Sequence, residues 1–312
     1  MGSGVRLKPD TWSSETPGGS VAVLGLGGIG GMLAARTGAL CVGTERAVEA
    51  IRASGVTLVH AGTTTVAHPR AVTHLDRPVS LLVVAVKAYA LDEALDRVEA
   101  AALAGAVVLP LLNGLEHVEL LRARLAGSGA AVAAGSIGRV EAFSPDPGVV
   151  VQRSEGPALV TAAMDDLART ALEAALTPLA VPGIEVVVAD DERGVLWEKA
   201  ARLAVLSAAS IAAGKSVGAL RDDPDWRPRL QAALREACAV AEADAVVLDA
   251  GTQWSIVESL PGSLVPSAAR DAAVGRPTEL DAITGSVVRA ARRLGVWTPM
   301  LDGLLADAGR HS

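Results

Sequence analysis

Short apolar runs rich in Val and Leu alternate with longer helix-forming segments over the first half of the chain. The clearest runs occupy residues 21–25, 39–43, 81–87 and 106–112. Continuous apolar runs of this length are typical of strands buried on both faces, and their alternation with helical segments is typical of a parallel sheet covered by helices. The pattern therefore predicts an α/β domain at the start of the folded chain.

Farther along, turn-forming residues separate shorter apolar runs. Residues 129–143 and 148–154 flank the turn-rich sequence SPDPG, which predicts an antiparallel hairpin added to the sheet. Two more candidate strands, residues 158–164 and 184–190, bracket a helical stretch from Asp165 to about Leu179.

Beyond Asp190 the strand pattern disappears and apolar residues recur at helical spacing. Two such series are Leu230, Leu234, Ala237 and Ala241, and Leu280, Ile283, Val287, Ala291 and Leu294. Thr278 and Asp281 have the spacing of a capping box before the second series, and Gly295 and Pro299 follow it as stop signals. We therefore expect an all-helical second domain.

These patterns divide the chain into a leader at residues 1–20, an α/β domain at 21–189 and a helical domain at 190–312. The leader is polar and rich in Gly, Ser and Pro, so we expect a disordered segment or an expression-vector remnant rather than a secretory signal. The longest apolar run, residues 100–112, contains Gly105 and Pro110 and is too short to cross a bilayer. We expect a cytoplasmic protein without a membrane span.

Composition narrows the class of ligand. A chain of 312 residues exceeds the usual size of a single core, so two domains with a ligand-binding cleft are expected. Aromatic residues make up 2% and the net charge is -7, which argues against nucleic acid and leaves a small molecule as the partner. Cys41 and Cys238 lack disulfide or zinc spacing and the histidines are scattered, so we expect no metal site.

A glycine-rich turn, Gly25-Leu26-Gly27-Gly28-Ile29-Gly30, follows the first apolar run and opens a helical segment. Glycines at such a turn let the backbone approach a pyrophosphate at a helix N-terminus, and the last one allows close packing of helix on strand. Such turns also arise by chance in a chain rich in Ala and Gly, but this one has its strand and helix in order. We expect dinucleotide contacts at Gly25, Gly27, Gly28, Ile29 and Gly30.

The residues after the second run give conflicting indications of whether the adenosine ribose of the cofactor carries a 2′-hydroxyl, as in NAD, or a 2′-phosphate, as in NADP. Glu45 lies about twenty residues past the first glycine, where an acid binds the ribose 2′-hydroxyl of NAD. Arg46, with Thr44, would instead hold the 2′-phosphate of NADP, because a guanidinium matches phosphate geometry. Only one of Glu45 and Arg46 need face the site, and both could be ordinary solvated charges.

One polar residue ends the third run and another follows the fourth, at the edge of the sheet where ligands of open α/β folds collect. Lys87 is one, although a lysine often ends a strand without further role. Asn113 is the other, and with Glu116 three residues later it could equally cap the next helix.

Lys199 is a candidate proton donor in the second domain. Leu196, Lys199, Leu203 and Leu206 recur at helical spacing, so the lysine lies on an apolar face. Burial lowers a lysine pKa toward neutrality, which suits acid–base work, whereas the ordinary alternative is a side chain that reaches solvent.

A second polar cluster precedes the last predicted helices. Its members are Ser267, Arg270, Asp271, Glu279 and Asp281. Capping, helix-dipole and ion-pair roles would explain several of them without any catalytic function.

Taken together, the motifs resemble those of the ketopantoate reductases (2-dehydropantoate 2-reductases) over nearly the whole chain after residue 20. The matching pieces are GLGGIGG, the turn at Arg46, VKAY at Val86–Tyr89, LLNG at Leu111–Gly114, WEK at Trp197–Lys199, and PSAARD followed by GRPTELD. Each piece is weak alone, but their order and spacing are specific.

The resemblance implies a Rossmann-type dinucleotide-binding domain followed by an all-helical catalytic domain. It implies an NADP-dependent oxidoreductase that reduces a 2-oxo acid with NADPH, as in pantothenate biosynthesis. Arg46 would hold the 2′-phosphate, which favours it over Glu45, and Lys87 would also serve the cofactor. Asn113 would position the substrate beside the nicotinamide.

On the same resemblance, Lys199 would donate a proton to the carbonyl oxygen while the nicotinamide supplies hydride. Glu279 would hold that lysine and a substrate hydroxyl, and Ser267 would bind the substrate carboxylate. Members of the family typically carry asparagines four and eight residues after the lysine, where this chain has Leu203 and Ser207. The missing amides put ketopantoate itself in doubt, because a site that hydrogen-bonds a substrate hydroxyl depends on such groups.

Two alternatives therefore stay open. One is a reductase of the same fold that acts on a different carbonyl or an imine in specialised metabolism. The other is a non-catalytic protein that senses NADP(H) or binds a partner. The apolar stretch from Leu203 to Gly214 suits either a core or the subunit contact of a homodimer.

Overall fold

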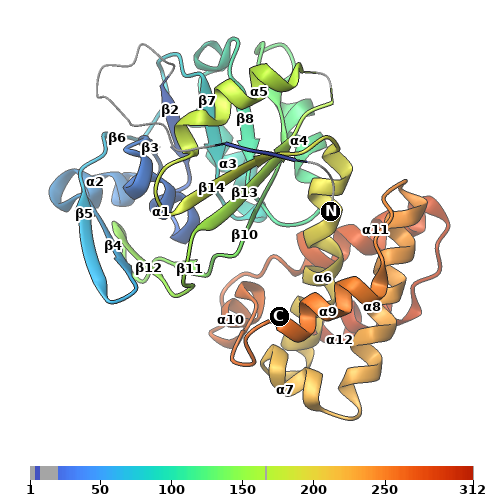
Figure 1. Ribbon diagram of the computed structural model, residues 1–312. Helices are drawn as coiled ribbons and strands as arrows, with labels where there is room; N and C mark the ends of the chain where they lie inside the picture. Colours follow the sequence, from blue (N-terminus) through green and yellow to red (C-terminus); the bar gives the residue numbers. More distant parts are fainter. Residues whose placement is uncertain (1–3, 8–19, 166, 312) are drawn as a thin grey trace. The chain divides into compact units, whose positions relative to one another are not determined.

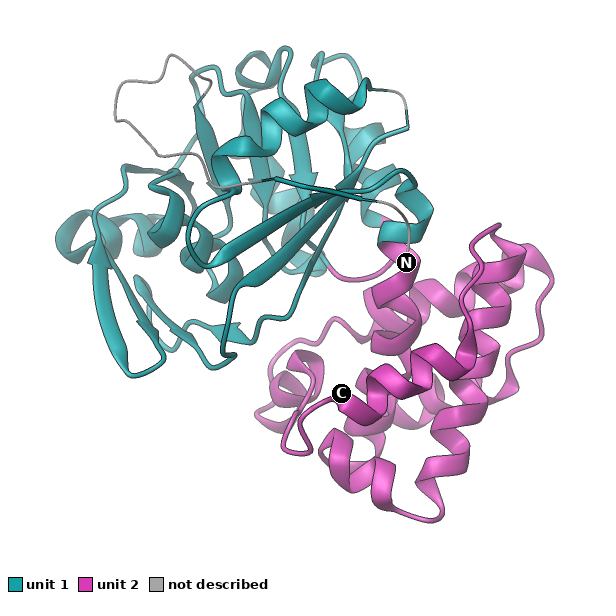
Figure 2. Cartoon of the chain, in the orientation of Figure 1, with its two compact units in different colours: residues 1–112, 117–195 teal, residues 113–116, 196–312 magenta. Residues whose placement is uncertain are grey.

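The computed structural model describes residues 4–7, 20–165 and 167–311, and these divide into two compact units. The first unit, called the nucleotide unit below, runs up to Leu112 and from His117 to Val195 (Figure 2). The second, the helical unit, contains Asn113–Glu116 and Leu196–Ser312. Each unit has its own cluster of buried apolar side chains.

A six-stranded parallel sheet forms the centre of the nucleotide unit (Figure 1). Its order is β6-β3-β2-β7-β8-β9, with the strands β2 (Val21–Leu24), β3 (Leu40–Val42), β6 (Ala71–Val72), β7 (Leu81–Val84), β8 (Val107–Pro110) and β9 (Ala131–Val132). The four apolar runs of the sequence are the four central strands, and every residue of β7 and β8 is buried. The prediction of a doubly covered parallel sheet is confirmed.

The helices of this unit connect the strands. They are α1 (Gly28–Thr37), α2 (Glu45–Ser54), α3 (Leu91–Leu95), α4 (His117–Arg124) and α5 (Arg169–Leu176), with short 3-10 turns η1 (Ala88–Ala90), η2 (Ala100–Leu103) and η3 (Thr177–Leu179). Helix α2 begins with a capped first turn, because the Thr44 hydroxyl accepts a hydrogen bond from the backbone N–H of Ala47.

Two smaller sheets complete the unit. One has the order β1-β14-β13-β10 and contains β1 (Val5–Arg6), β10 (Ala134–Gly138), β13 (Ala158–Ala163) and β14 (Ile184–Val188). The other has the order β11-β12-β4-β5 and contains β4 (Val56–His60), β5 (Thr63–Ala67), β11 (Ala142–Phe143) and β12 (Val149–Gln152). The predicted hairpin forms as β11 and β12, but it joins β4 instead of the large sheet.

The first twenty residues differ from the prediction of a disordered leader where the structure describes them. Val5 and Arg6 form strand β1, which pairs antiparallel with Val188 and Val187 of β14. The prediction is therefore wrong for residues 4–7, and residues 1–3 and 8–19 lie outside the described part.

Within the described residues, the helical unit consists of helices and connecting loops. Its elements are α6 (Glu192–Ala213), which starts in the nucleotide unit, α7 (Val217–Asp222), α8 (Trp226–Ala243), α9 (Ala250–Ser259), α10 (Ser267–Ala273), the π-helical turn η4 (Asp281–Gly285), α11 (Ser286–Leu294) and α12 (Pro299–Gly309). Residues 204–211 of α6 are buried in the core of this unit, so the apolar stretch after Leu203 is a core segment. None of the helices in the described ranges is long and apolar enough to cross a bilayer.

The start of the last predicted helix differs from a capping box. The Thr278 hydroxyl accepts a hydrogen bond from Leu280 N at 3.5 Å, while the carboxylate of Asp281 accepts one from Arg289 at 2.7 Å. The carboxylate of Asp281 therefore binds a side chain eight residues, or just over two helical turns, farther along the chain. The predicted stop is correct, because Gly295 ends α11 in the left-handed conformation with φ of 71°.

Candidate functional site

The glycine turn packs tightly against the sheet. Gly25 has φ of +95°, and a Cβ there would lie 2.9 Å from the Ala85 carbonyl group. A Cβ on Gly30 would collide with the Gly25 carbonyl oxygen, so glycine is required for α1 to approach the turn. Gly27, in contrast, faces open space, and it precedes α1 without a side-chain cap. The first N–H groups of α1 are thus left for an anionic ligand.

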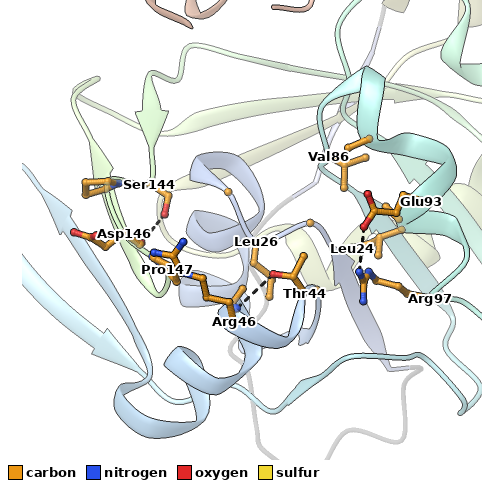
Figure 3. A pocket seen from close by; sticks show the side chains of 17 residues that line it. Leu24, Leu26, Thr44, Arg46, Val86, Glu93, Arg97, Ser144, Asp146 and Pro147 are labelled. Atoms are coloured by element: carbon orange, nitrogen blue, oxygen red, sulfur yellow. Dashed lines mark hydrogen bonds and ion pairs between the residues drawn. The ribbon is translucent and has the colours of Figure 1, made fainter. Parts of the chain in front are cut away.

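A pocket of about 450 Å³ opens beside this turn (Figure 3). Gly25, Gly27, Thr44 and Arg46 contribute to its lining, together with Gly43 at the end of β3. The pocket therefore lies at the carboxyl ends of β2 and β3, where parallel α/β sheets bind nucleotides.

Arg46 and Glu45 differ in their relation to the pocket. Both side chains are exposed, but only Arg46 lines it. Glu45 lies in the first turn of α2, where a carboxylate interacts favourably with the helix dipole. Of the two residues that the sequence offered for the adenosine ribose, only Arg46 therefore lies where it can contact a ligand in the pocket.

A wall of the pocket that the sequence did not indicate carries Glu93 and Arg97. Arg97 Nη2 donates to Glu93 Oε1 at 3.3 Å, and the Arg97 side chain is only 22% exposed. Figure 3 shows this pair on the side of the pocket opposite Pro147, with Thr44 between them. Their spacing of four residues is that of an ordinary helix-surface pair, so the sequence offers no signal of a second cation at the pocket.

The turn between β11 and β12 forms another wall. Ser144, Pro145, Asp146 and Pro147 all line the pocket. The hairpin reaches this place because α1 begins with a residue that lacks a side chain: a Cβ on Gly28 would lie 2.6 Å from Phe143 Cα. The SPDPG sequence, first recognised only as a turn, thus belongs to the candidate nucleotide site.

Other predicted cofactor residues lie near the pocket without lining it. Gly28, Ile29 and Gly30 form the start of α1, and Lys87 directly follows the lining residue Val86. Lys87 is half-buried and precedes the short turn η1. Their direct contact with a cofactor stays a prediction.

In the helical unit, α6 and the segment before η4 supply the candidate catalytic pair. Lys199 is half-buried on α6, and Glu279 is only 3% exposed. Burial lowers the pKa of Lys199 to about 8; the negative charge of Glu279 opposes this decrease, and the positive charge of Arg202 adds to it. The two predicted catalytic residues thus interact within one unit.

The loop of Asn113 packs onto the same part of the helical unit. Gly114 has φ of +95°, and a Cβ there would collide with the Ala282 carbonyl oxygen of η4. Glu116 binds Arg289 through two hydrogen bonds, Nε to Oε1 at 2.8 Å and Nη2 to Oε2 at 2.7 Å. Helix α4 begins only at His117, so the alternative of Asn113 and Glu116 as a capping box is wrong.

Ser267 begins α10 and is half-buried. Its neighbour Asp271 pairs with Arg276 at 3.0 Å, which agrees with an ion-pair role. Lys199, Glu279, Asn113 and Ser267 therefore all belong to the helical unit, whereas the glycine turn and Arg46 belong to the nucleotide unit.

Metal ligands do not cluster in the described part of the chain, where no group of three or more His, Cys, Asp or Glu side chains could hold an ion. Both cysteines are buried free thiols, and burial raises the pKa of Cys41 to about 12 and that of Cys238 to about 11. Neither thiol is therefore a nucleophile at neutral pH.

Comparison with known proteins gives the family. Residues 21–164 match the family "Ketopantoate reductase PanE/ApbA", and residues 191–308 match "Ketopantoate reductase PanE/ApbA C terminal". A 2-dehydropantoate 2-reductase of Halobacterium salinarum is 30% identical, over 93% of this chain and 97% of that protein.

Solved structures agree with this assignment. A PanE/ApbA family ketopantoate reductase from Ralstonia eutropha JMP134 is 27% identical, with a TM-score of 0.78 and coverage of 93% of this chain and 97% of that one. A D-mandelate dehydrogenase solved with NADH and anilino(oxo)acetate shares the fold at 21% identity, with a TM-score of 0.80 over 94% and 98% of the two chains. The resemblance seen in the motifs is thereby confirmed, as is the Rossmann-type domain followed by a helical one: the chain belongs to the ketopantoate reductase family of NADP-dependent oxidoreductases.

Proposed function

We propose that this protein reduces the carbonyl group of a 2-oxo acid with NADPH, and that Lys199 donates the proton. The observation that carries the proposal is the Lys199–Glu279 pair, in which burial lowers the lysine pKa to about 8. A group with a pKa near the working pH is an effective general acid, because it is both protonated and able to release its proton. The carbonyl carbon gains a hydride and the oxygen gains this proton, so the product is a 2-hydroxy acid.

The nucleotide pocket fits the proposed cofactor. The uncapped start of α1 and the open space at Gly27 suit a pyrophosphate, and Arg46 in the lining suits the 2′-phosphate of NADPH. When bound, NADPH supplies the hydride. Lys87, which follows the lining residue Val86, is proposed to contact the cofactor as well.

The remaining roles follow the family pattern. Glu279 holds the Lys199 ammonium and a substrate hydroxyl, and its near-complete burial keeps that carboxylate in place. Ser267 binds the substrate carboxylate. Asn113 positions the substrate beside the nicotinamide, with its loop fixed by the Glu116–Arg289 hydrogen bonds.

We propose that the substrate is a 2-oxo acid other than ketopantoate. Leu203 is half-buried one turn after Lys199 and offers no hydrogen bond. Ser207 is 0% exposed, and its hydroxyl has no hydrogen-bond partner among the described residues, so it is not presented to a ligand either. The D-mandelate dehydrogenase complex supports this choice, because that protein of the same fold was solved with anilino(oxo)acetate, a compound without the ketopantoate hydroxyl.

Initial rates with NADPH and NADH across a panel of 2-oxo acids, simple ketones and imines test the proposal. We expect oxidation of NADPH with at least one 2-oxo acid, at a higher kcat/KM than with ketopantoate. Lys199→Ala should lower turnover by about 10²–10⁴-fold and leave the Kd for NADPH unchanged. Absence of turnover across the panel, or an unchanged rate in Lys199→Ala, would contradict the proposal and favour a non-catalytic role.

A further inference from the structure

A second cation lies one helical turn from the proposed proton donor. Arg202 is half-buried on α6, and its Nη1 donates a hydrogen bond to the side-chain oxygen of Gln253 on α9. Gln253 is itself only 5% exposed. The amide therefore holds one end of the guanidinium in a fixed position.

This arginine has no carboxylate partner among the described residues, since its hydrogen bond goes to a neutral amide. The contrast with Arg289 is clear, because that side chain binds both Glu116 and Asp281. Burial lowers the pKa of Arg202, and Glu198 opposes this only through its charge. A partly buried cation without a paired anion is costly unless a ligand supplies the negative charge.

Arg202 also lies on the same face of α6 as Lys199. Lys199, Arg202 and Leu203 are partly exposed, whereas Ala200, Ala201 and Ala204 are buried in the core of the unit. The first three side chains, at positions i, i+3 and i+4, therefore share one face of α6 at the edge of the core, against which Leu203 packs. Three residues correspond to a rise of about 4.5 Å along a helix, which is within the length of a small substrate.

We infer that Arg202 binds a carboxylate of the substrate, with Gln253 positioning the guanidinium. The inference rests on the proposed function and extends it to a residue outside the family motifs quoted above. The guanidinium nitrogen atoms that do not contact Gln253 can donate two parallel hydrogen bonds to a carboxylate, as arginine does in bidentate pairs. Leu203, on the same face, would contact the carbon chain of that substrate.

Substrates of equal chain length show whether Arg202 binds the carboxylate beside the carbonyl group or one at the far end of the substrate. 2-Oxoglutarate and 2-oxopentanoate have the same five-carbon chain, but only the first has a carboxylate at its far end. Pentan-2-one has none. We expect Arg202→Gln to lower kcat/KM for 2-oxoglutarate by about tenfold or more, because hydrogen bonds to charged groups are the stronger class.

A loss confined to 2-oxoglutarate would assign Arg202 to the distal carboxylate, and an equal loss on both acids would assign it to the carboxylate beside the carbonyl. Either result supports the inference, provided that kcat/KM for pentan-2-one is unaffected at pH 6, where Lys199 is protonated with or without the charge of Arg202. Unchanged kinetics with both acids, or the same loss on the ketone, would overturn it. Arg292→Gln is the matched control, because that arginine is 69% exposed and pairs with Asp302 on the surface.

A binding experiment separates this inference from the proposed function. Thermal stabilisation by glutarate, by pentanoate and by pentan-2-one needs no turnover. We expect stabilisation of the wild-type protein by at least one of the two acids, and its loss in Arg202→Gln but not in Arg292→Gln. Equal stabilisation of wild type and Arg202→Gln, or none of the wild type, would overturn the inference even if NADPH oxidation is observed.

Arg202→Lys covers the case in which the glutamine variant does not fold. It keeps the charge but loses the planar pair of donors. We expect weaker acid binding than in the wild type with no change for pentan-2-one, whereas wild-type acid binding would count against the guanidinium as the ligand.

Discussion

The negative charge of Glu279 keeps the pKa of Lys199 from falling as far as burial alone would lower it. The pKa of Lys199 is about 8, between the ordinary value of 10.5 and that of a fully desolvated amine. The lysine is thus largely protonated at pH 7 and largely neutral at pH 9. Its charge state changes within the range in which enzyme rates are easily measured.

The first prediction concerns the pH dependence of the two reaction directions. Carbonyl reduction needs the protonated lysine, so kcat/KM should be highest below pH 8 and decrease above it. Oxidation of the hydroxy acid needs the neutral amine, so its rate should increase through the same pH. Initial rates between pH 6 and 10 measure both limbs. A reduction limb with a midpoint near pH 10.5 would contradict burial as the cause.

The second prediction concerns the charge of Glu279. Glu279→Gln removes the interaction that raises the lysine pKa, so the reduction limb should move to lower pH. Arg202→Gln removes a charge that lowers the pKa, so the limb should move to higher pH. Opposite shifts in the two variants distinguish electrostatic tuning from loss of structure, which would lower the rate without moving the midpoint. Shifts of the same sign would contradict the assignment.

The third prediction concerns cofactor choice. Arg46→Gln should increase the KM for NADPH by about tenfold or more and change the KM for NADH little, because only NADPH carries the 2′-phosphate. Glu45→Gln is the matched control, since the neighbouring side chain does not line the pocket. It should leave both KM values unchanged and lower stability by only a few tenths of a kcal/mol to about 1 kcal/mol through the helix dipole. A change of cofactor preference in Glu45→Gln would reverse the assignment.

The sequence predicted the parts of the fold that local patterns encode. The four buried strands, the glycine turn and the apolar faces of the helical unit all follow from short-range composition and period. Strand β5 reads TTTVA and is mostly exposed, so no apolar pattern revealed it. The pairing of β12 with β4 joins segments about ninety residues apart, which no local turn signal could specify.

The residues of the candidate site also divide into those that local sequence patterns indicate and those that only tertiary contacts bring into place. Lys199 was recognised from its apolar neighbours along one helix, and its depressed pKa agrees with that reasoning. Arg97 is not among the predicted site residues, because the pocket beside it is built by residues far away in sequence. Glu116 looked like a capping residue, whereas its carboxylate binds Arg289, 173 residues later. Contacts of this kind depend on tertiary packing and leave no trace in local spacing.

The fourth prediction concerns the loop that carries Asn113. Gly114→Ala and Gly105→Ala both place a side chain at a positive φ, which costs roughly 1–2 kcal/mol. A Cβ at Gly105 meets nothing within 4 Å, whereas one at Gly114 collides with the Ala282 carbonyl oxygen. Gly114→Ala should therefore lose a further 1–3 kcal/mol or so of stability and reduce kcat by displacing Asn113. Thermal unfolding and turnover of the two variants measure the difference, and equal losses would show that the loop can move without cost.

The fifth prediction concerns Leu203, one of the two residues at which this chain departs from the family pattern. Ketopantoate and 3,3-dimethyl-2-oxobutanoate differ only by the hydroxyl group of the first, so their kcat/KM ratio reports hydrogen bonding to that group. Leu203→Asn places an amide on the half-exposed face of α6 beside Lys199, and should increase this ratio by about tenfold or more. Leu203→Ala removes the same apolar side chain without adding an amide and should leave the ratio unchanged. An equal ratio in the two variants would show that Leu203 does not determine the substrate. A measured preference for other 2-oxo acids over ketopantoate would then depend on another residue of the site.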